Sequence, residues 1–212
     1  MINLVFDYDG TLHDSIKIYI PSFRKCCELM KADGENVGQY SEDEIKSYIG
    51  MDAKSMWNEF RPDLPQEKKD KYSLFIGANM LELIQAGNAE LYKGVPEMLS
   101  GLKDKYRLIF LSSCKRDYMQ EHIKHFKLDK YFADFYCTED FGFVPKYKVF
   151  DTVKGRYDGQ YIIIGDRYSD IEIAVRNKIK SIGCLYGYGN TKELKYADIK
   201  VGSIEQLSKA LI

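Results

Sequence analysis

The segment Asp7-Tyr8-Asp9-Gly10-Thr11-Leu12 follows directly on a short apolar run, Leu4-Val5-Phe6, near the start of the 212-residue chain. Apolar runs this short, bounded by polar residues, predict buried strands of a parallel sheet. Residues that follow such a strand lie at the edge of the sheet where open α/β folds bind their ligands. Gly10 permits a turn at which Asp7 and Asp9 can converge. The first strand is therefore predicted to deliver two carboxylates to a binding crevice.

Further apolar runs repeat this pattern, and helical patterns separate most of them. The runs span residues 107–111, 131–136, 161–164 and 181–185, and the helical patterns cover residues 117–126, 148–154 and 170–177, with another that starts at Pro96. Such alternation predicts an α/β fold whose core is a doubly wound, Rossmann-like parallel sheet.

The region from residue 15 to residue 86 does not alternate. It holds successive helical patterns over residues 15–30, 41–49, 53–60 and 66–86. An insert of this length is too long for an ordinary crossover. We therefore expect an inserted α-helical cap over residues 15–86 and an α/β core built from residues 1–14 and 87–212. The alternative is that these helices only cover one face of the sheet.

The composition excludes several classes of protein. A net charge of −1 gives no electrostatic reason to expect nucleic acid or an anionic membrane as a partner. The first residues lack the pattern of an export signal, and no stretch approaches the length of a membrane span. The five cysteines include no C-x-x-C pair, which suits reduced thiols. A soluble cytoplasmic protein is expected, and no oligomeric state is indicated.

Polar residues also follow other predicted strands. Ser112-Ser113-Cys114-Lys115 ends one run, and Gly165-Asp166-Arg167-Tyr168-Ser169-Asp170 ends another. Lys146 and Lys148 stand in a segment expected to be a loop before a helix. Carboxylates gathered at one sheet edge would repel one another without a cation, and hard oxygen ligands suit Mg²⁺. A hydroxyl and an ammonium beside them suit phosphoryl oxygens, so the set predicts a site for a phosphate ester.

These segments together resemble the haloacid dehalogenase superfamily, in particular its phosphoglycolate-phosphatase-like members with a helical cap. Residues 7–12 match the first motif, D-x-D-G-T-L, and Gly165-Asp166-x-x-x-Asp170 matches the fourth. Ser113 matches the second motif and Lys146 the third. Residues 91–97 also look like the segment at which the chain of such members re-enters the core.

The resemblance implies Mg²⁺-dependent hydrolysis of a small phosphorylated metabolite. Asp7 would be the nucleophile that forms an aspartyl-phosphate, and Asp9 the general acid and then base. Mg²⁺ would be held by Asp7, the backbone carbonyl of Asp9, and Asp166, with Asp170 as a further ligand or as a partner of the metal's waters. The residues expected to bind and position the phosphoryl group are Gly10, Thr11, Ser113, Cys114 and Lys146.

Alternatives remain open at two positions and for the activity. Ser112 competes with Ser113, and Lys148 competes with Lys146. A sugar-phosphate mutase of the same superfamily is one rival function, although Tyr19 stands where mutases carry a histidine. The other rival is a non-catalytic phosphate-binding regulatory module.

Other notable residues are given structural roles by their patterns. His13, His122 and His125 are expected to be ordinary polar or surface residues, the last two on a solvated helix face. Residues 186–189, Tyr-Gly-Tyr-Gly, are expected to form a turn-rich loop. Met56 and Trp57 are expected in the core of the cap.

Overall fold

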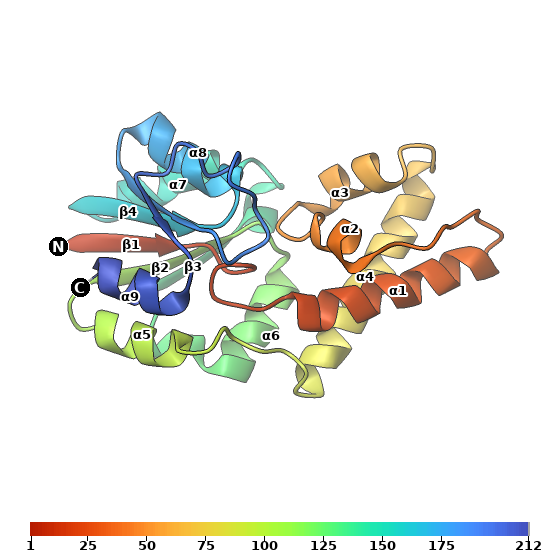
Figure 1. The fold of residues 1–212 in the computed structure, drawn as a ribbon, viewed down its shortest axis with the longest axis horizontal. Helices are drawn as coiled ribbons and strands as arrows, with labels where there is room; N and C mark the ends of the chain where they lie inside the picture. Colours follow the sequence, from red (N-terminus) through yellow and green to blue (C-terminus); the bar gives the residue numbers. More distant parts are fainter. Residues whose placement is uncertain (212) are drawn as a thin grey trace.

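The computed structural model describes residues 1–211, and its centre is a parallel sheet with helices on both faces (Figure 1). The strands are β1 (Ile2–Phe6), β2 (Arg107–Ser112), β3 (Asp134–Cys137), β4 (Gln160–Gly165), β5 (Lys180–Cys184) and β6 (Ile199–Val201). Their order in the sheet is β3-β2-β1-β4-β5-β6, and every neighbouring pair is parallel. This is the doubly wound order, with the reversal of strand order beside β1. The predicted fold class is confirmed.

The two faces of β1 explain why three successive residues, Leu4, Val5 and Phe6, are all apolar. Leu4 and Phe6 share a hydrophobic cluster with residues of α5 (Val95–Leu102), α6 (Arg116–Phe126) and α9 (Ile204–Leu211). Val5 points to the opposite face, where its cluster includes residues of α7 (Lys146–Arg156) and α8 (Tyr168–Asn177). Because consecutive side chains on a strand alternate in direction, a strand covered on both sides must be apolar at every position.

Two edge elements differ from the prediction. Strand β3 begins only at Asp134, because a 3-10 helix, η1 (Leu128–Lys130), and a turn occupy the residues before it. Strand β6 was not predicted, and two of its residues, Ile199 and Lys200, are exposed. An edge strand of three residues, two of them exposed, leaves little hydrophobic signal in the sequence.

Helices α1 (Ile16–Ala32), α2 (Glu42–Lys46), α3 (Ala53–Phe60) and α4 (Gln66–Gln85) lie to one side of the sheet (Figure 1). They surround their own hydrophobic cluster, in which Phe23, Trp57 and Tyr72 are almost completely buried. Within α2, Ser41 and Glu44 form the capping box that their spacing predicts. No helix within residues 1–211 combines the length and hydrophobicity that crossing a membrane requires.

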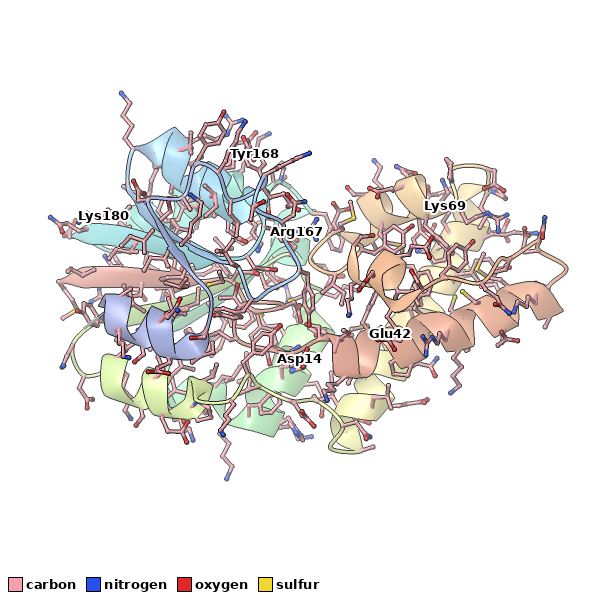
Figure 2. The ribbon with its side chains drawn as sticks, in the orientation of Figure 1. Asp14, Glu42, Lys69, Arg167, Tyr168 and Lys180 are labelled. Carbon is pink, nitrogen blue, oxygen red and sulfur yellow. The ribbon has the colours of Figure 1, made fainter. Side chains whose placement is uncertain are left out.

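Arg167 ties these helices to the sheet (Figure 2). It lies directly after β4, and its Nη1 donates a hydrogen bond of 2.5 Å to the carbonyl of Ile49. Its Nε lies 2.9 Å from Oε2 of Glu193 on the core side. The helical segment is thus anchored next to the carboxyl end of β4.

Candidate active site

Asp7 occupies the position at which β1 ends. Its backbone N–H donates to the carbonyl of Ile164 at 2.8 Å, which extends the pairing of β1 with β4 by one residue. The side chain is 5% exposed and pairs with the ammonium of Lys146. Lys146 also lies 2.7 Å from Oδ1 of Asp170. One buried cation therefore bridges carboxylates from two different strand ends.

Asp7, Asp166 and Asp170 form a buried acidic cluster. Each offers a carboxylate oxygen, and these oxygens all lie within 4.8 Å of one another. Burial, then the charge of Asp170, raises the pKa of Asp7 well above its ordinary value and that of Asp166 to about 6. A single lysine cannot neutralise three carboxylates, whereas Lys146 and a divalent cation with oxygen ligands together supply the three positive charges required. The cluster has the composition and size of a site for such a cation.

The turn after β1 is shaped around Asp166. Gly10 has φ +84°, and a Cβ at this position would lie 2.4 Å from Oδ2 of Asp166. The same oxygen accepts hydrogen bonds from the backbone N–H groups of Tyr188 (2.7 Å) and Gly189 (3.3 Å). Thr11 Oγ1 lies 3.4 Å from the other carboxylate oxygen. The loop after β5, predicted only as a turn-rich connection, therefore helps to orient an acidic residue of the cluster.

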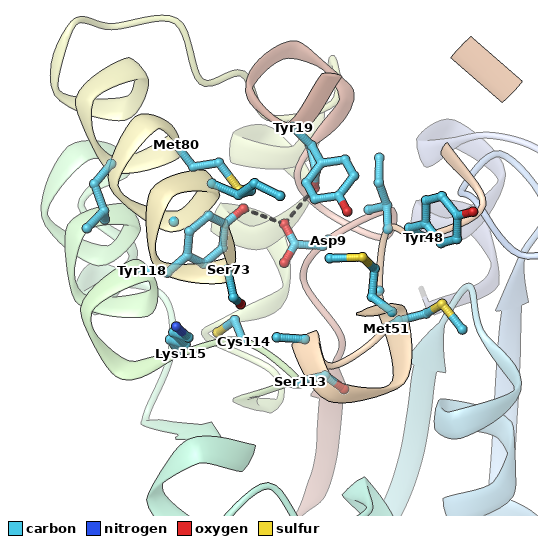
Figure 3. Close-up of a pocket in the computed structure, with 18 of the residues that line it drawn as sticks. Asp9, Tyr19, Tyr48, Met51, Ser73, Met80, Ser113, Cys114, Lys115 and Tyr118 are labelled. Atoms are coloured by element: carbon cyan, nitrogen blue, oxygen red, sulfur yellow. Dashed lines mark hydrogen bonds between the residues drawn. The ribbon is translucent and has the colours of Figure 1, made fainter. Parts of the chain in front are cut away.

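The Asp9 carboxylate lies apart from the acidic cluster and has its own partners. Its Oδ1 accepts from Tyr118 Oη at 2.7 Å (Figure 3). It also accepts from Ser15 Oγ at 2.5 Å and lies 3.0 Å from His13 Nδ1. Burial favours a raised pKa, but the hydrogen bond and charge of His13, with the Ser15 hydrogen bond, lower the pKa of Asp9 to about 2. Asp9 is therefore held ionised. The expected metal contact through its backbone carbonyl stays a prediction.

The structure places the competing serines and lysines in different surroundings. Ser112 is buried, and its Oγ accepts a hydrogen bond of 3.3 Å from the N–H of Cys114. Ser113 is only partly buried and lines two cavities, one of which Cys114 also lines. Lys148 is exposed, whereas Lys146 is buried against the acidic cluster. Lys146 is the first residue of α7, so its predicted position in a loop is wrong. The helix begins there because Pro145, which has no backbone N–H to donate, immediately precedes it.

The prediction of a solvated His122 is wrong. This residue is completely buried, and its Nδ1 lies 2.7 Å from the hydroxyl of Tyr8. It falls between Met119 and Phe126 on the face of α6 that packs against the sheet, at the three- and four-residue spacing of an apolar stripe. His13 is likewise buried and stacks on Tyr8 with ring centroids 5.1 Å apart. His125 is exposed, as predicted.

Tyr118, Ser15 and Tyr188 are site residues that the sequence analysis missed. Tyr118 and Ser15 bind Asp9, and the Tyr188 hydroxyl lies 3.0 Å from Oδ1 of Asp14. Of the three residues, only Ser15 could have been found from the sequence, because it closely follows the first motif. Tyr118 comes from a helix whose orientation no local pattern specifies.

A family model described as haloacid dehalogenase-like hydrolase matches residues 4–184. The chain belongs to this family. The predicted membership of a superfamily of hydrolytic enzymes is thus confirmed, and the motifs quoted above all fall within the matched residues.

Individual relatives of this haloacid dehalogenase-like chain agree with the assignment. The crystal structure of a predicted phosphatase from Clostridium acetobutylicum is 27% identical, with a TM-score of 0.82 over 99% of this chain and 97% of that one. A predicted phosphoglycolate phosphatase from Haemophilus somnus shares the fold at 21% identity, with a TM-score of 0.82 over 99% and 97% of the two chains. A 5'-nucleotidase from Pseudomonas aeruginosa is 27% identical over 112 residues, and the match spans 50% of each chain.

Proposed function

We propose that the chain is a magnesium-dependent phosphatase that hydrolyses a small phosphorylated metabolite through an aspartyl-phosphate intermediate. The observation that carries this proposal is the position of Asp7. Its carboxylate ends the central strand, pairs with Lys146, and belongs to a buried acidic cluster with Asp166 and Asp170. The names of the matched relatives, which include a predicted phosphatase and a 5'-nucleotidase, support it.

The proposed reaction has two displacements at phosphorus. In the first, an oxygen of Asp7 bonds to phosphorus while the bond to the leaving oxygen breaks, and Asp9 transfers a proton to that oxygen. In the second, Asp9 takes a proton from water, the water oxygen bonds to phosphorus, and the bond to Asp7 breaks. The pKa of Asp9 is about 2, so Asp9 must gain a proton as the negatively charged phosphoryl group binds, a change that the added charge favours.

The remaining proposed roles concern charge. Mg²⁺ would be held by Asp7, the backbone carbonyl of Asp9, and Asp166, with Asp170 contacting it directly or through water, and would offset the charge between nucleophile and phosphoryl oxygens. Lys146 would neutralise one phosphoryl oxygen, and Ser113 would donate a hydrogen bond to another. The backbone around Gly10 and Thr11, together with Cys114, would complete the phosphate site.

We include two broader features in the proposal. Residues 15–86 act as a cap that brings substrate-contacting residues over a core formed by residues 1–14 and 87–212; the separate hydrophobic cluster of α1 to α4 supports this division. The protein works in the cytoplasm, which its free cysteines support.

Hydrolysis of p-nitrophenyl phosphate tests the proposal. The parent protein should release p-nitrophenol with Mg²⁺ present and lose this activity in EDTA. Asp7→Asn should lower kcat by about 10³-fold or more, because the nucleophile is removed. Asp151→Asn is the matched control, since this carboxylate is exposed and lies outside the acidic cluster. Activity that survives Asp7→Asn would overturn the nucleophile assignment, and phosphate binding without turnover of any ester would favour a regulatory module.

A further inference from the structure

We infer that the leaving group of the substrate is an uncharged alcohol with a flat, apolar or aromatic body, as in benzyl phosphate or a nucleoside monophosphate. This inference rests on the proposed function and adds a substrate class to it. It comes from two adjoining cavities beside the acidic cluster, of which only the first has several charged and hydroxyl groups close to Lys146.

The first cavity, the polar cavity, carries hydroxyl and charged side chains among apolar ones and adjoins the acidic cluster through Lys146. Its volume is about 280 Å³, and its walls include Lys146, Thr138, Ser169 and Arg167. The walls also hold two carboxylates, but Asp52 accepts from Ser55 and Glu193 pairs with Arg167, which leaves Lys146 and the hydroxyls as the groups that suit phosphoryl oxygens.

The second cavity extends from Asp9 toward α3 and α4 (Figure 3). Its volume of about 350 Å³ is within the range of small-molecule sites. The two cavities share the wall residues Gly50, Met51, Ser113 and Phe143. A bound ester could therefore place its phosphoryl group in the polar cavity and its leaving group in the other, with the leaving oxygen near Asp9.

Large apolar and aromatic side chains dominate the second cavity. They are Tyr19, Tyr48, Ile49, Met51, Met56, Ile76, Met80, Leu81 and Tyr118. Methionine side chains make favourable contacts with aromatic rings, and tyrosine rings stack on flat groups. A sugar with many hydroxyls would lose water here without gaining enough hydrogen bonds in return.

The charged residues of the second cavity disfavour a second anionic group on the leaving group. Of the carboxylate and ammonium groups in this wall, Asp9 and Asp117 are negative and Lys115 is positive. Once Asp9 is protonated in the substrate complex, Lys115 and Asp117 offset one another, so a carboxylate on the leaving group, as in 2-phosphoglycolate, would lose its hydration in a mostly apolar cavity without a free cation to pair with. An uncharged leaving group avoids this loss.

The opening of the cavity carries two exposed apolar side chains. Leu74 is 65% exposed and Phe143 is 43% exposed, and both line the cavity. Phe143 also has φ +58°, a left-handed conformation that is rare and unfavourable for a bulky residue. Its backbone N–H donates to the carbonyl of Thr138 at 2.8 Å, which holds this turn in place. Strain of this kind concentrates at ligand-binding sites, and here it keeps an aromatic ring at the border of the two cavities.

Pairs of esters with the same type of leaving oxygen test the inference. The first pair is uridine 5'-monophosphate and ribose 5-phosphate, which has a hydroxyl in place of the base. The second pair is benzyl phosphate and 2-phosphoglycolate, which has a carboxylate in place of the aromatic ring. We expect kcat/KM to be at least about 10-fold higher for the first member of each pair, because its apolar part becomes buried. Equal or reversed ratios, with turnover that still depends on Asp7, would overturn the inference and leave the proposed function intact.

A variant and a binding measurement make the test independent of folding and of turnover. Met80→Lys places a cation in the partly exposed wall and should reverse the preference of benzyl phosphate over 2-phosphoglycolate, whereas Val175→Lys, on the exposed surface of α8, should keep it. By calorimetry, benzylphosphonate, which cannot be hydrolysed, should bind the parent protein at least about 10-fold more tightly than ethylphosphonate. Equal affinities would contradict the inference even if no ester were turned over.

Discussion

The hydroxyl of Tyr8 lies 2.7 Å from Nδ1 of His122, although 114 positions separate the two residues in the chain. Both side chains are completely buried. The pair joins the first motif to α6, the helix that also supplies Tyr118 to Asp9. Tyr8 lies between Asp7 and Asp9 in the chain. Its hydrogen bond to His122 therefore helps to hold the backbone of the first motif in place.

His122 makes the protein sensitive to acid. Burial, then the charge of His13, lowers the pKa of His122 to about 2, whereas in the unfolded chain it is near 6.5. Above pH 6.5 both states leave His122 neutral; below it only the unfolded chain gains the proton, so stability falls as pH falls. Between pH 6.5 and 5 the loss is about 2 kcal/mol.

Urea unfolding at a series of pH values measures this loss. Between pH 6.5 and 5 the parent should lose about 2 kcal/mol of unfolding free energy relative to His122→Gln, whereas its difference from His125→Gln, at an exposed position of the same helix, should stay constant. Parallel curves for the parent and His122→Gln would show that His122 does not cause the loss.

The sheet could be predicted from the sequence because its central strands are buried on both faces. The runs that became β1, β2 and β4 had to be apolar at every position, and that pattern is readable locally. The motifs at their ends were readable for a related reason, since parallel strands bring their carboxyl ends to one edge. Strand β6 offered no such pattern, because it is short and two of its residues are exposed.

The surroundings of Asp9 and Asp166 could not be predicted in this way. The Tyr118 hydroxyl reaches Asp9 from α6, and the backbone N–H of Tyr188 reaches Asp166 from the loop after β5, so both contacts depend on how those elements pack. A tyrosine in a loop or on a helix has no sequence signal that distinguishes a contact to a catalytic group from an ordinary surface position. His122 was misjudged because neighbouring lysines suggested a solvated helix face.

Loss of Lys146 should destabilise the metal-free protein. Lys146→Met leaves the carboxylates of Asp7 and Asp170 buried without their shared cation, which should cost about 3–5 kcal/mol of unfolding free energy in EDTA. It should also lower kcat by about 10²-fold or more. Lys148→Met, at an exposed position two residues away, should change stability by less than about 0.5 kcal/mol and leave kcat unaltered. The reverse ranking of the two variants would assign the phosphate-site lysine to Lys148.

Mg²⁺ should stabilise the protein through the acidic cluster. At a concentration about 100 times its Kd, the ion should add about 2.7 kcal/mol, which corresponds to a rise in Tm of about 5–10 °C for a chain of this size. Asp166→Asn and Asp170→Asn should reduce the rise, because each removes a carboxylate of the cluster. Asp151→Asn, which alters an exposed ion pair with Lys154, should retain it. A Tm that does not respond to Mg²⁺ in the parent protein would argue against a magnesium site.

Tyr118 should affect the departure of poor leaving groups. Tyr118→Phe removes the 2.7 Å hydrogen bond to Asp9, so the carboxylate that is proposed to protonate the leaving oxygen loses a positioning contact. We expect kcat/KM for benzyl phosphate to fall about 10-fold or more, as for loss of a hydrogen bond to a charged group. The fall for p-nitrophenyl phosphate should be smaller, because its leaving group departs without protonation.

A matched tyrosine controls for general effects of this change. Tyr106→Phe removes a hydrogen bond to the carbonyl of Leu211. Tyr106 directly precedes β2, at the end of the strand opposite the site, so kcat/KM should stay unchanged for both substrates. Equal losses for the two esters in Tyr118→Phe would mean that Tyr118 supports the site only structurally.

Gly10 should tolerate no side chain, because its surroundings and its backbone conformation both exclude one. Gly10→Ala places a Cβ 2.4 Å from Oδ2 of Asp166 at a residue with φ +84°. The left-handed conformation alone costs about 1–2 kcal/mol, and relief of the clash would displace Asp166 from the acidic cluster. The variant should therefore lose both stability in urea unfolding and most of the Mg²⁺-induced rise in Tm. Gly101→Ala, in α5 with open space around the added carbon, should instead gain about 0.5–1 kcal/mol. A normal Mg²⁺ response in Gly10→Ala would show that this turn does not shape the cluster.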